Sequence, residues 1–83
     1  MNPNLEKIDE AVLALLYLTR FQEGGGPFAV TRAWKGHDWD AMDRLHQKGM
    51  ILDPVVKAKS VVLTEKGEKL CEELFRKHFC ISR

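Results

Sequence analysis

Apolar residues near the N-terminus recur every three or four positions, which is the spacing of one face of a helix. These residues are Leu5, Ile8, Val12, Leu15 and Leu16. The pattern predicts a helix over residues 4–20, with Asn2 or Asn4 as its N-cap. Further apolar side chains widen the surface beyond one stripe, so this helix is either deeply buried or paired with another subunit.

Three consecutive glycines at residues 24–26 and Pro27 then interrupt the pattern. Proline is favoured at the first position of a helix, so Pro27 predicts a short second helix over residues 28–35, ended by Gly36. A phosphate-binding loop is the functional alternative for the glycines. The Lys-Ser or Lys-Thr pair that such a loop requires does not follow them.

A third helix is predicted over residues 38–48. Asp38 is a favoured N-cap, and Met42 and Leu45 would point inward. Gly49 suits the left-handed position that follows many helices.

The period changes after Gly49. Residues 50–52 and 61–63 are short apolar runs typical of strands, and a turn signal separates them. Together they predict a two-stranded hairpin whose tip carries Lys57 and Lys59.

Thr64 would cap a last helix over residues 65–79. The predicted class is therefore α+β and mainly α: three helices, a two-stranded β-wing and a C-terminal helix. This order is that of a winged helix-turn-helix, in a single domain over residues 1–83.

Two segments, LHQKGMI and VVLTEKG, resemble the winged helix regulators of the broad MarR and PadR kind. The resemblance covers roughly residues 28–75 and implies a winged helix fold. The matching positions are Leu45, Gly49, Ile51, Leu63, Thr64 and Gly67.

Nearly the whole chain is also similar to a small family of uncharacterised bacterial proteins. The runs that carry this similarity are RAWKG, LHQKGMI and KAKSVVLTEKG. It implies a domain of unknown function and adds no chemistry.

The fold suggests a dimeric transcriptional regulator that binds double-stranded DNA, with its first and last helices paired across a two-fold axis. The charge opposes this hypothesis. The net charge is +1 and the isoelectric point about 7.8, whereas DNA-binding domains often exceed about 9. Basic side chains that would contact DNA are Arg32, Lys35, Arg44, Lys57 and Lys59, and ordinary solvated charges are the alternative for them.

The third helix, which usually enters the major groove, is acidic. A second hypothesis is therefore a protein-interaction module with the winged helix fold and no DNA binding, whose partner contacts Trp39, Asp40 and Asp43. Packing of Trp39 into the turn is the alternative. We expect Trp34 to pack in the core.

Neither catalysis nor metal binding is expected. No nucleophile lies in a recognisable motif, and no spacing is typical of zinc ligands or of a cofactor site. We also expect a cytoplasmic protein without a membrane span, because no apolar run reaches 18 residues. Cys71 and Cys80 would lie roughly 13 Å apart on one helix, so both should be free thiols.

Overall fold

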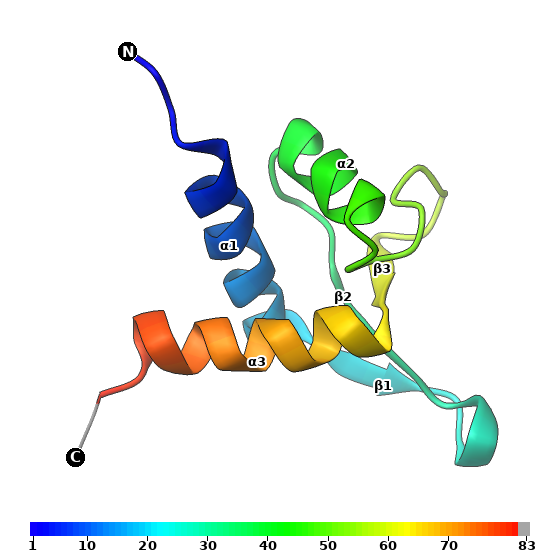
Figure 1. The fold of residues 1–83 in the computed structure, drawn as a ribbon. Helices are drawn as coiled ribbons and strands as arrows, with labels where there is room; N and C mark the ends of the chain where they lie inside the picture. The colour runs from blue at the N-terminus through cyan, green and yellow to red at the C-terminus, as the bar shows by residue number, and fades with distance from the viewer. Residues whose placement is uncertain (82–83) are drawn as a thin grey trace.

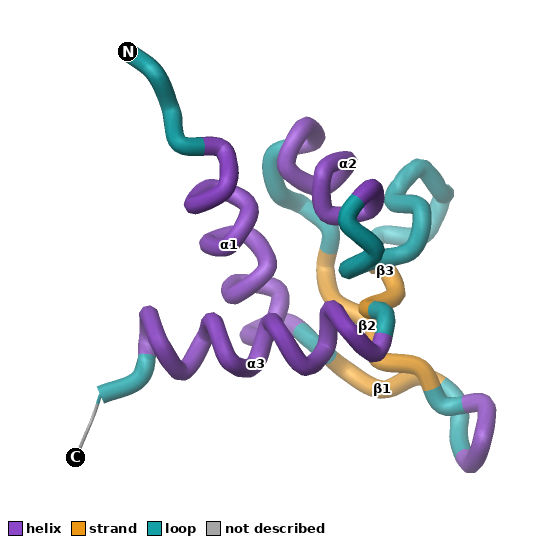
Figure 2. The backbone as a smooth tube through the Cα atoms, in the orientation of Figure 1, coloured by secondary structure: helices purple, strands orange, loops and turns teal. Residues whose placement is uncertain are grey.

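A computed structural model describes residues 1–81 of the chain. It contains three α-helices and a three-stranded antiparallel sheet (Figure 1), so the class is α+β and mainly helical. Short 3₁₀ turns follow the first helix and form the tip of the first hairpin (Figure 2). The elements are α1 (Leu5–Leu16), η1 (Tyr17–Thr19), β1 (Phe21–Glu23), η2 (Gly26–Phe28), β2 (Val30–Trp34), α2 (Trp39–Gln47), β3 (Ser60–Leu63) and α3 (Glu65–Phe79).

Each α-helix begins at a side-chain cap. The side-chain oxygens of Asn4, Asp38 and Thr64 each accept a hydrogen bond from the backbone N–H three residues further on. Gly49 follows α2 with a φ of 78°, the left-handed conformation that favours glycine. The helices predicted over residues 38–48 and 65–79 are thus confirmed. The first predicted helix is confirmed as α1 continued by η1.

The predicted second helix, over residues 28–35, is wrong. Residues in β2 alternate with period two: Thr31 and Ala33 are buried, and Val30 and Trp34 are exposed. Pro27 does open a helical turn, but only the single 3₁₀ turn η2. Without that helix, residues 28–48 form no helix-turn-helix, and the winged helix assignment is not confirmed.

The sheet has the order β1-β2-β3. Gly24 and Gly26 both have positive φ, which lets the chain turn between β1 and β2. The strand predicted over residues 50–52 is reduced to one bridge between Ile51 and Leu63. The main partner of β3 is therefore β2, and the predicted two-stranded wing is the edge of a wider sheet.

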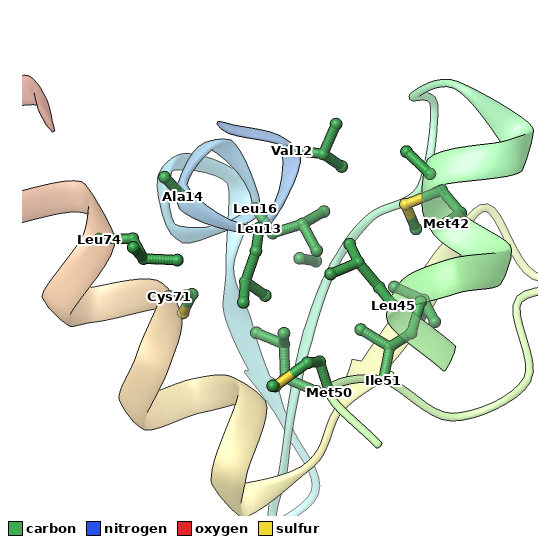
Figure 3. Packing of buried hydrophobic residues seen from close by; sticks show 14 residues of the cluster. Val12, Leu13, Ala14, Leu16, Met42, Leu45, Met50, Ile51, Cys71 and Leu74 are labelled. Carbon is green, nitrogen blue, oxygen red and sulfur yellow. The ribbon is translucent and has the colours of Figure 1, made fainter. Parts of the chain in front are cut away.

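The three helices lie over one face of the sheet, and the core lies between (Figure 3). Leu13 and Leu16 of α1, Met42 and Leu45 of α2, and Cys71 of α3 are almost fully buried there. The molecule is flat, with principal extents of 44 × 36 × 18 Å. Val30 and Trp34 on the outer face of the sheet are exposed, so no other element within residues 1–81 covers them fully.

Several residues that carry the winged helix resemblance meet at one junction. The Thr64 hydroxyl donates a hydrogen bond to the carbonyl oxygen of Gly49 at 2.6 Å and also lies 3.1 Å from that of Met50. Gly67 passes so close to Met50 that a Cβ there would overlap its carbonyl oxygen. These contacts determine how the start of α3 crosses the segment that follows α2, and they do not depend on a winged helix fold.

Candidate functional site

Arg32, the first of the predicted DNA-contacting cations, is held within the sheet. Its Nε donates to Ser60 Oγ at 2.7 Å and its Nη2 to the Ser60 carbonyl at 3.1 Å. Glu23 Oε1 lies 3.9 Å from its third nitrogen, and the side chain is only 15% exposed. The guanidinium therefore joins all three strands instead of pointing freely into solvent.

Lys35 is also occupied. Its ammonium donates to the carbonyl oxygen of Pro54 at 2.7 Å and to that of Val56. These contacts anchor the long loop between Ile51 and β3 to the end of β2. A DNA phosphate would have to compete with them.

Arg44 belongs to a buried ion cluster that the sequence-based predictions did not include. The Asp9 side chain on α1 is 3% exposed and accepts from Arg44 Nε at 2.9 Å and from Lys48 Nζ at 2.8 Å. Burial by itself raises the pKa of Asp9, but the hydrogen bonds and charges of the two cations outweigh it. The net effect is a pKa of Asp9 below its usual range.

A signal for this cluster was present in the sequence. Asp9 falls three and four residues before Val12 and Leu13, so it occupies the apolar stripe of a helix. An acid in that position calls for a buried cation. Arg44 and Lys48, four residues apart on one helix face, supply two.

Lys57 and Lys59 differ from the other three cations. Both lie exposed in the loop between Ile51 and β3. Neither ammonium makes a hydrogen bond or ion pair with the residues that the structure describes. The Lys35 N–H donates to the Lys59 carbonyl at 3.1 Å, so these lysines lie close together. Of the five predicted cations, Lys57 and Lys59 are the ones whose side chains have no internal partner within residues 1–81.

The side chains predicted for protein contact do share one exposed surface. Trp39 and Asp40 form the first turn of α2, and Trp39 is 62% exposed, so packing of its ring into the turn is wrong. Asp43 is exposed one turn further, where its carboxylate accepts from Gln47 Nε2 at 2.9 Å. We call Trp39, Asp40 and Asp43 the α2 surface.

A second exposed apolar surface lies on the outer face of the sheet. Trp34, expected in the core, is 50% exposed there, and its ring centroid is 6.1 Å from that of Phe21. Val30 on β2 is also exposed, as is Leu52, whose N–H donates to the Val62 carbonyl at 2.9 Å. The sequence prediction missed this face because a helix over residues 28–35 cannot form it.

The apolar surfaces of the first and last helices are partly used within the chain. Tyr17 and Phe75 stack with centroids 4.8 Å apart, and Phe75 also meets Phe79 at 5.6 Å. Leu5 and Ile8 on α1 remain exposed, as do Leu18 and Phe79. The predicted dimer through these helices stays a prediction.

Both cysteines are free thiols, as predicted. Cys71 is buried in the core, and burial raises the pKa of its thiol to about 11, whereas Cys80 is exposed. Within residues 1–81, His, Cys, Asp and Glu side chains form no group of three suited to a metal ion. None of the helices in this part of the chain is long and apolar enough to cross a membrane.

A family model matches residues 4–81. The chain belongs to the family described as domain of unknown function DUF6429. It is also 54% identical over 74 residues to the "Uncharacterized protein y4hR" of Sinorhizobium fredii (strain NBRC 101917 / NGR234). That alignment covers 89% of this chain and 90% of the relative. No solved structure matches the chain.

These findings confirm the similarity to a small family of unknown function and give no support to the MarR and PadR resemblance. Because the relative matches along nearly its whole length, the same fold is expected there.

Proposed function

We propose that this chain is a protein-binding module without chemistry of its own, which contacts its partner through the α2 surface. The observation that carries the proposal is the exposure of Trp39 beside two exposed carboxylates. Tryptophan is enriched among the residues that contribute most to protein interfaces. An indole exposed at the first turn of a helix is ready for such a contact.

The chemistry of the α2 surface favours a basic partner. Asp40 and Asp43 add negative charge, and Arg44, the nearest cation on the helix, is bound to Asp9. A lysine or arginine of the partner can pair with the carboxylates, and its cation can also lie over the Trp39 ring. The proposed partner is a soluble protein that presents basic residues around an apolar contact, within the cytoplasm.

A DNA-binding regulator with a winged helix is the second candidate. The exposed ammonium groups of Lys57 and Lys59 favour it. Against it, Arg32, Lys35 and Arg44 make internal hydrogen bonds. DNA affinity depends on cations that neutralise phosphates, so two exposed lysines would support only weak, strongly salt-dependent binding.

Affinity capture from a lysate of a source cell separates the candidates. We expect wild-type protein to retain a defined set of proteins. A Trp39→Ala, Asp43→Lys variant should retain at least tenfold less of these proteins. A Phe28→Ala, Glu73→Lys variant is the matched control, because it also removes one exposed aromatic and reverses one exposed acid, away from α2.

The same proteins are then titrated into labelled duplex DNA at low salt. Unchanged capture by the α2 variant would overturn the protein-binding proposal. Micromolar duplex binding that weakens with salt and is lost in Lys57→Glu, Lys59→Glu would favour the regulator instead.

A further inference from the structure

The side of the sheet that faces away from the helices presents two aromatic rings next to each other. Thr31 and Ala33 of β2 point into the core, so the residues that alternate with them point outward. Phe21 pairs with one of these residues across the strands and therefore lies on the same side. Its ring centroid is 6.1 Å from that of Trp34, and both rings are exposed. We define the outer sheet face as Phe21, Val30, Arg32, Trp34, Val62 and, beyond β3, Leu52.

The loop before β3 brings two free lysines to the Trp34 end of this face. Trp34 pairs with Ser60, and Lys59 directly precedes Ser60. The Lys35 N–H donates to the Lys59 carbonyl at 3.1 Å, which holds this part of the loop against the end of β2. Within residues 1–81, the ammonium groups of Lys57 and Lys59 make no hydrogen bond or ion pair. Both are therefore available to an anion that lies on the adjoining sheet.

Charge is divided unevenly between the sheet and the helices. Residues 20–35 and 50–63, which form the sheet and its loops, contain five basic and two acidic side chains, a net charge of +3. The whole chain carries +1, so the remaining residues, which include all three α-helices, carry −2. An anionic ligand is therefore attracted to the sheet and repelled by the helical layer.

The one acid on the outer side of the sheet lies away from the two lysines. Glu23 is opposite Val30, whereas Trp34 and Lys59 are at the other end of β2. Its carboxylate lies 3.9 Å from the Arg32 guanidinium, which compensates its charge. The aromatic rings and the free cations therefore share one end of the face without an uncompensated acid between them.

We propose that the outer sheet face binds a single-stranded nucleic acid, whose bases stack on Trp34 and Phe21 while its phosphates contact Lys57 and Lys59. Exposed aromatic side chains stack bases with little regard to sequence, and neighbouring cations hold the backbone. A duplex fits less well, because its bases are stacked on one another and cannot reach the rings. Two rings suit a segment of two or three nucleotides, so a sheet of three short strands is large enough.

Two protein ligands match this face less well. An acidic peptide can pair with the lysines, but the faces of aromatic rings are electron-rich and do not attract carboxylates. A basic protein, such as the partner proposed for the α2 surface, is repelled by the net positive charge of the sheet and its loops. Stacked bases joined by phosphates use both the rings and the lysines.

Anisotropy of labelled oligo(U) and oligo(dT) at low salt tests the proposal. We expect wild-type protein to bind at least one of them with a dissociation constant below about 100 µM and a duplex at least tenfold more weakly. The tighter of the two shows whether the strand is RNA or DNA. Trp34→Ala should weaken binding at least tenfold, and Trp34→Phe should keep most of it because a ring remains. Trp39→Ala, which removes a similarly exposed tryptophan from α2, should leave binding unchanged.

The salt dependence measures the phosphate contacts. For single strands, the logarithm of the binding constant falls with the logarithm of the salt concentration by about 0.7 per phosphate neutralised, so two lysines give a slope of about −1.4. Lys59→Gln should weaken binding and reduce the slope to about −0.7. Lys7→Gln, which removes an exposed lysine of α1, is the matched control and should leave the slope unchanged.

Tryptophan fluorescence locates the contact independently, because the chain has two tryptophans. In Trp39→Phe only Trp34 fluoresces, and the oligonucleotide should quench it. In Trp34→Phe, the fluorescence of Trp39 should not change. If Trp34→Ala proves unfolded by circular dichroism, Phe21→Ala replaces it.

Four results would overturn the proposal. The first is no binding of either oligonucleotide at about 100 µM protein. The second is an equal loss of affinity in Trp39→Ala and Trp34→Ala. The third is equal affinity for the duplex, and the fourth is competition by an oligoglutamate peptide as strong as that by unlabelled oligonucleotide.

The nucleic-acid site and the protein-binding function are separable. Trp34 lies on the sheet and Trp39 on α2, so one set of variants alters oligonucleotide binding and the other alters partner capture. Failure of either leaves the other standing.

Discussion

The carboxylate of Asp9 on α1 lies 2.8 Å from Nη2 of Arg44 on α2, and this ion pair joins the two helices at the edge of the core. Lys48, the C-cap residue of α2, completes the cluster. Because the Asp9 side chain is almost fully buried, its loss leaves two cations facing an uncharged group. We expect Asp9→Asn to lower the free energy of unfolding by about 2 kcal/mol at pH 7, as measured by urea denaturation.

Asp43→Asn is the matched control for this prediction. It removes a carboxylate from α2 that is exposed and accepts only from Gln47. We expect a change below about 0.5 kcal/mol, as for most surface substitutions. Equal effects of the two changes would contradict the structural role of Asp9.

The same cluster predicts a pH dependence. The pKa of Asp9 is lower in the folded protein than its ordinary value of 3.8, so the folded state binds this proton more weakly than the unfolded chain does. Its contribution to stability is complete above about pH 5 and is lost as the pH falls below about 4. The stability difference between wild type and Asp9→Asn should be constant from pH 5 to 8 and shrink between pH 4 and 2. A difference that stays constant to pH 2 would contradict the low pKa.

Gly67 supplies a test of the junction between α2 and α3. A Cβ at this position would overlap the Met50 carbonyl, and backbone atoms cannot give way as a flexible side chain can. We expect Gly67→Ala to lower the free energy of unfolding by about 3 kcal/mol, in spite of the better helix propensity of alanine. Gly36→Ala is the control, because a Cβ there meets nothing within 4 Å. Thermal unfolding of both variants measures this difference. If Gly67→Ala is as stable as the wild type, α3 does not cross so close to Met50.

Local signals in the sequence predicted the parts of the fold that depend on neighbouring residues. Asp38 and Thr64 are caps whose partners lie three residues away, and Gly49 takes the left-handed conformation for a local reason. Residues 28–35 could not be assigned in this way. Arg32 and Ala33 are residue types that also occur in helices. They form a strand here because they pair with β1 and with β3, and the residues of β3 lie nearly 30 positions later in the chain.

The candidate sites likewise differ in whether they depend on neighbouring residues or on residues far apart in the sequence. Exposure of Asp40 and Asp43 follows from the periodicity of one helix, so the acidic surface of α2 was predictable. The ion pair between Arg44 and Asp9 joins residues 35 positions apart, so no local sequence pattern predicts this pairing. The outer sheet face was missed for the same reason, because it exists only once three separate strands have paired.

The two cysteines give a last prediction. Cys71 lies in the core with its thiol pKa raised to about 11, so almost none of it is thiolate at pH 8, and its sulfur is shielded from reagents. Cys80 is exposed just beyond α3. Ellman's reagent at pH 8 should modify one thiol per folded chain within minutes and the second only when urea unfolds the protein. Cys80→Ser should abolish the fast phase and Cys71→Ser should preserve it. Fast reaction of two thiols in the folded wild type would show that α3 does not hold Cys71 against the core.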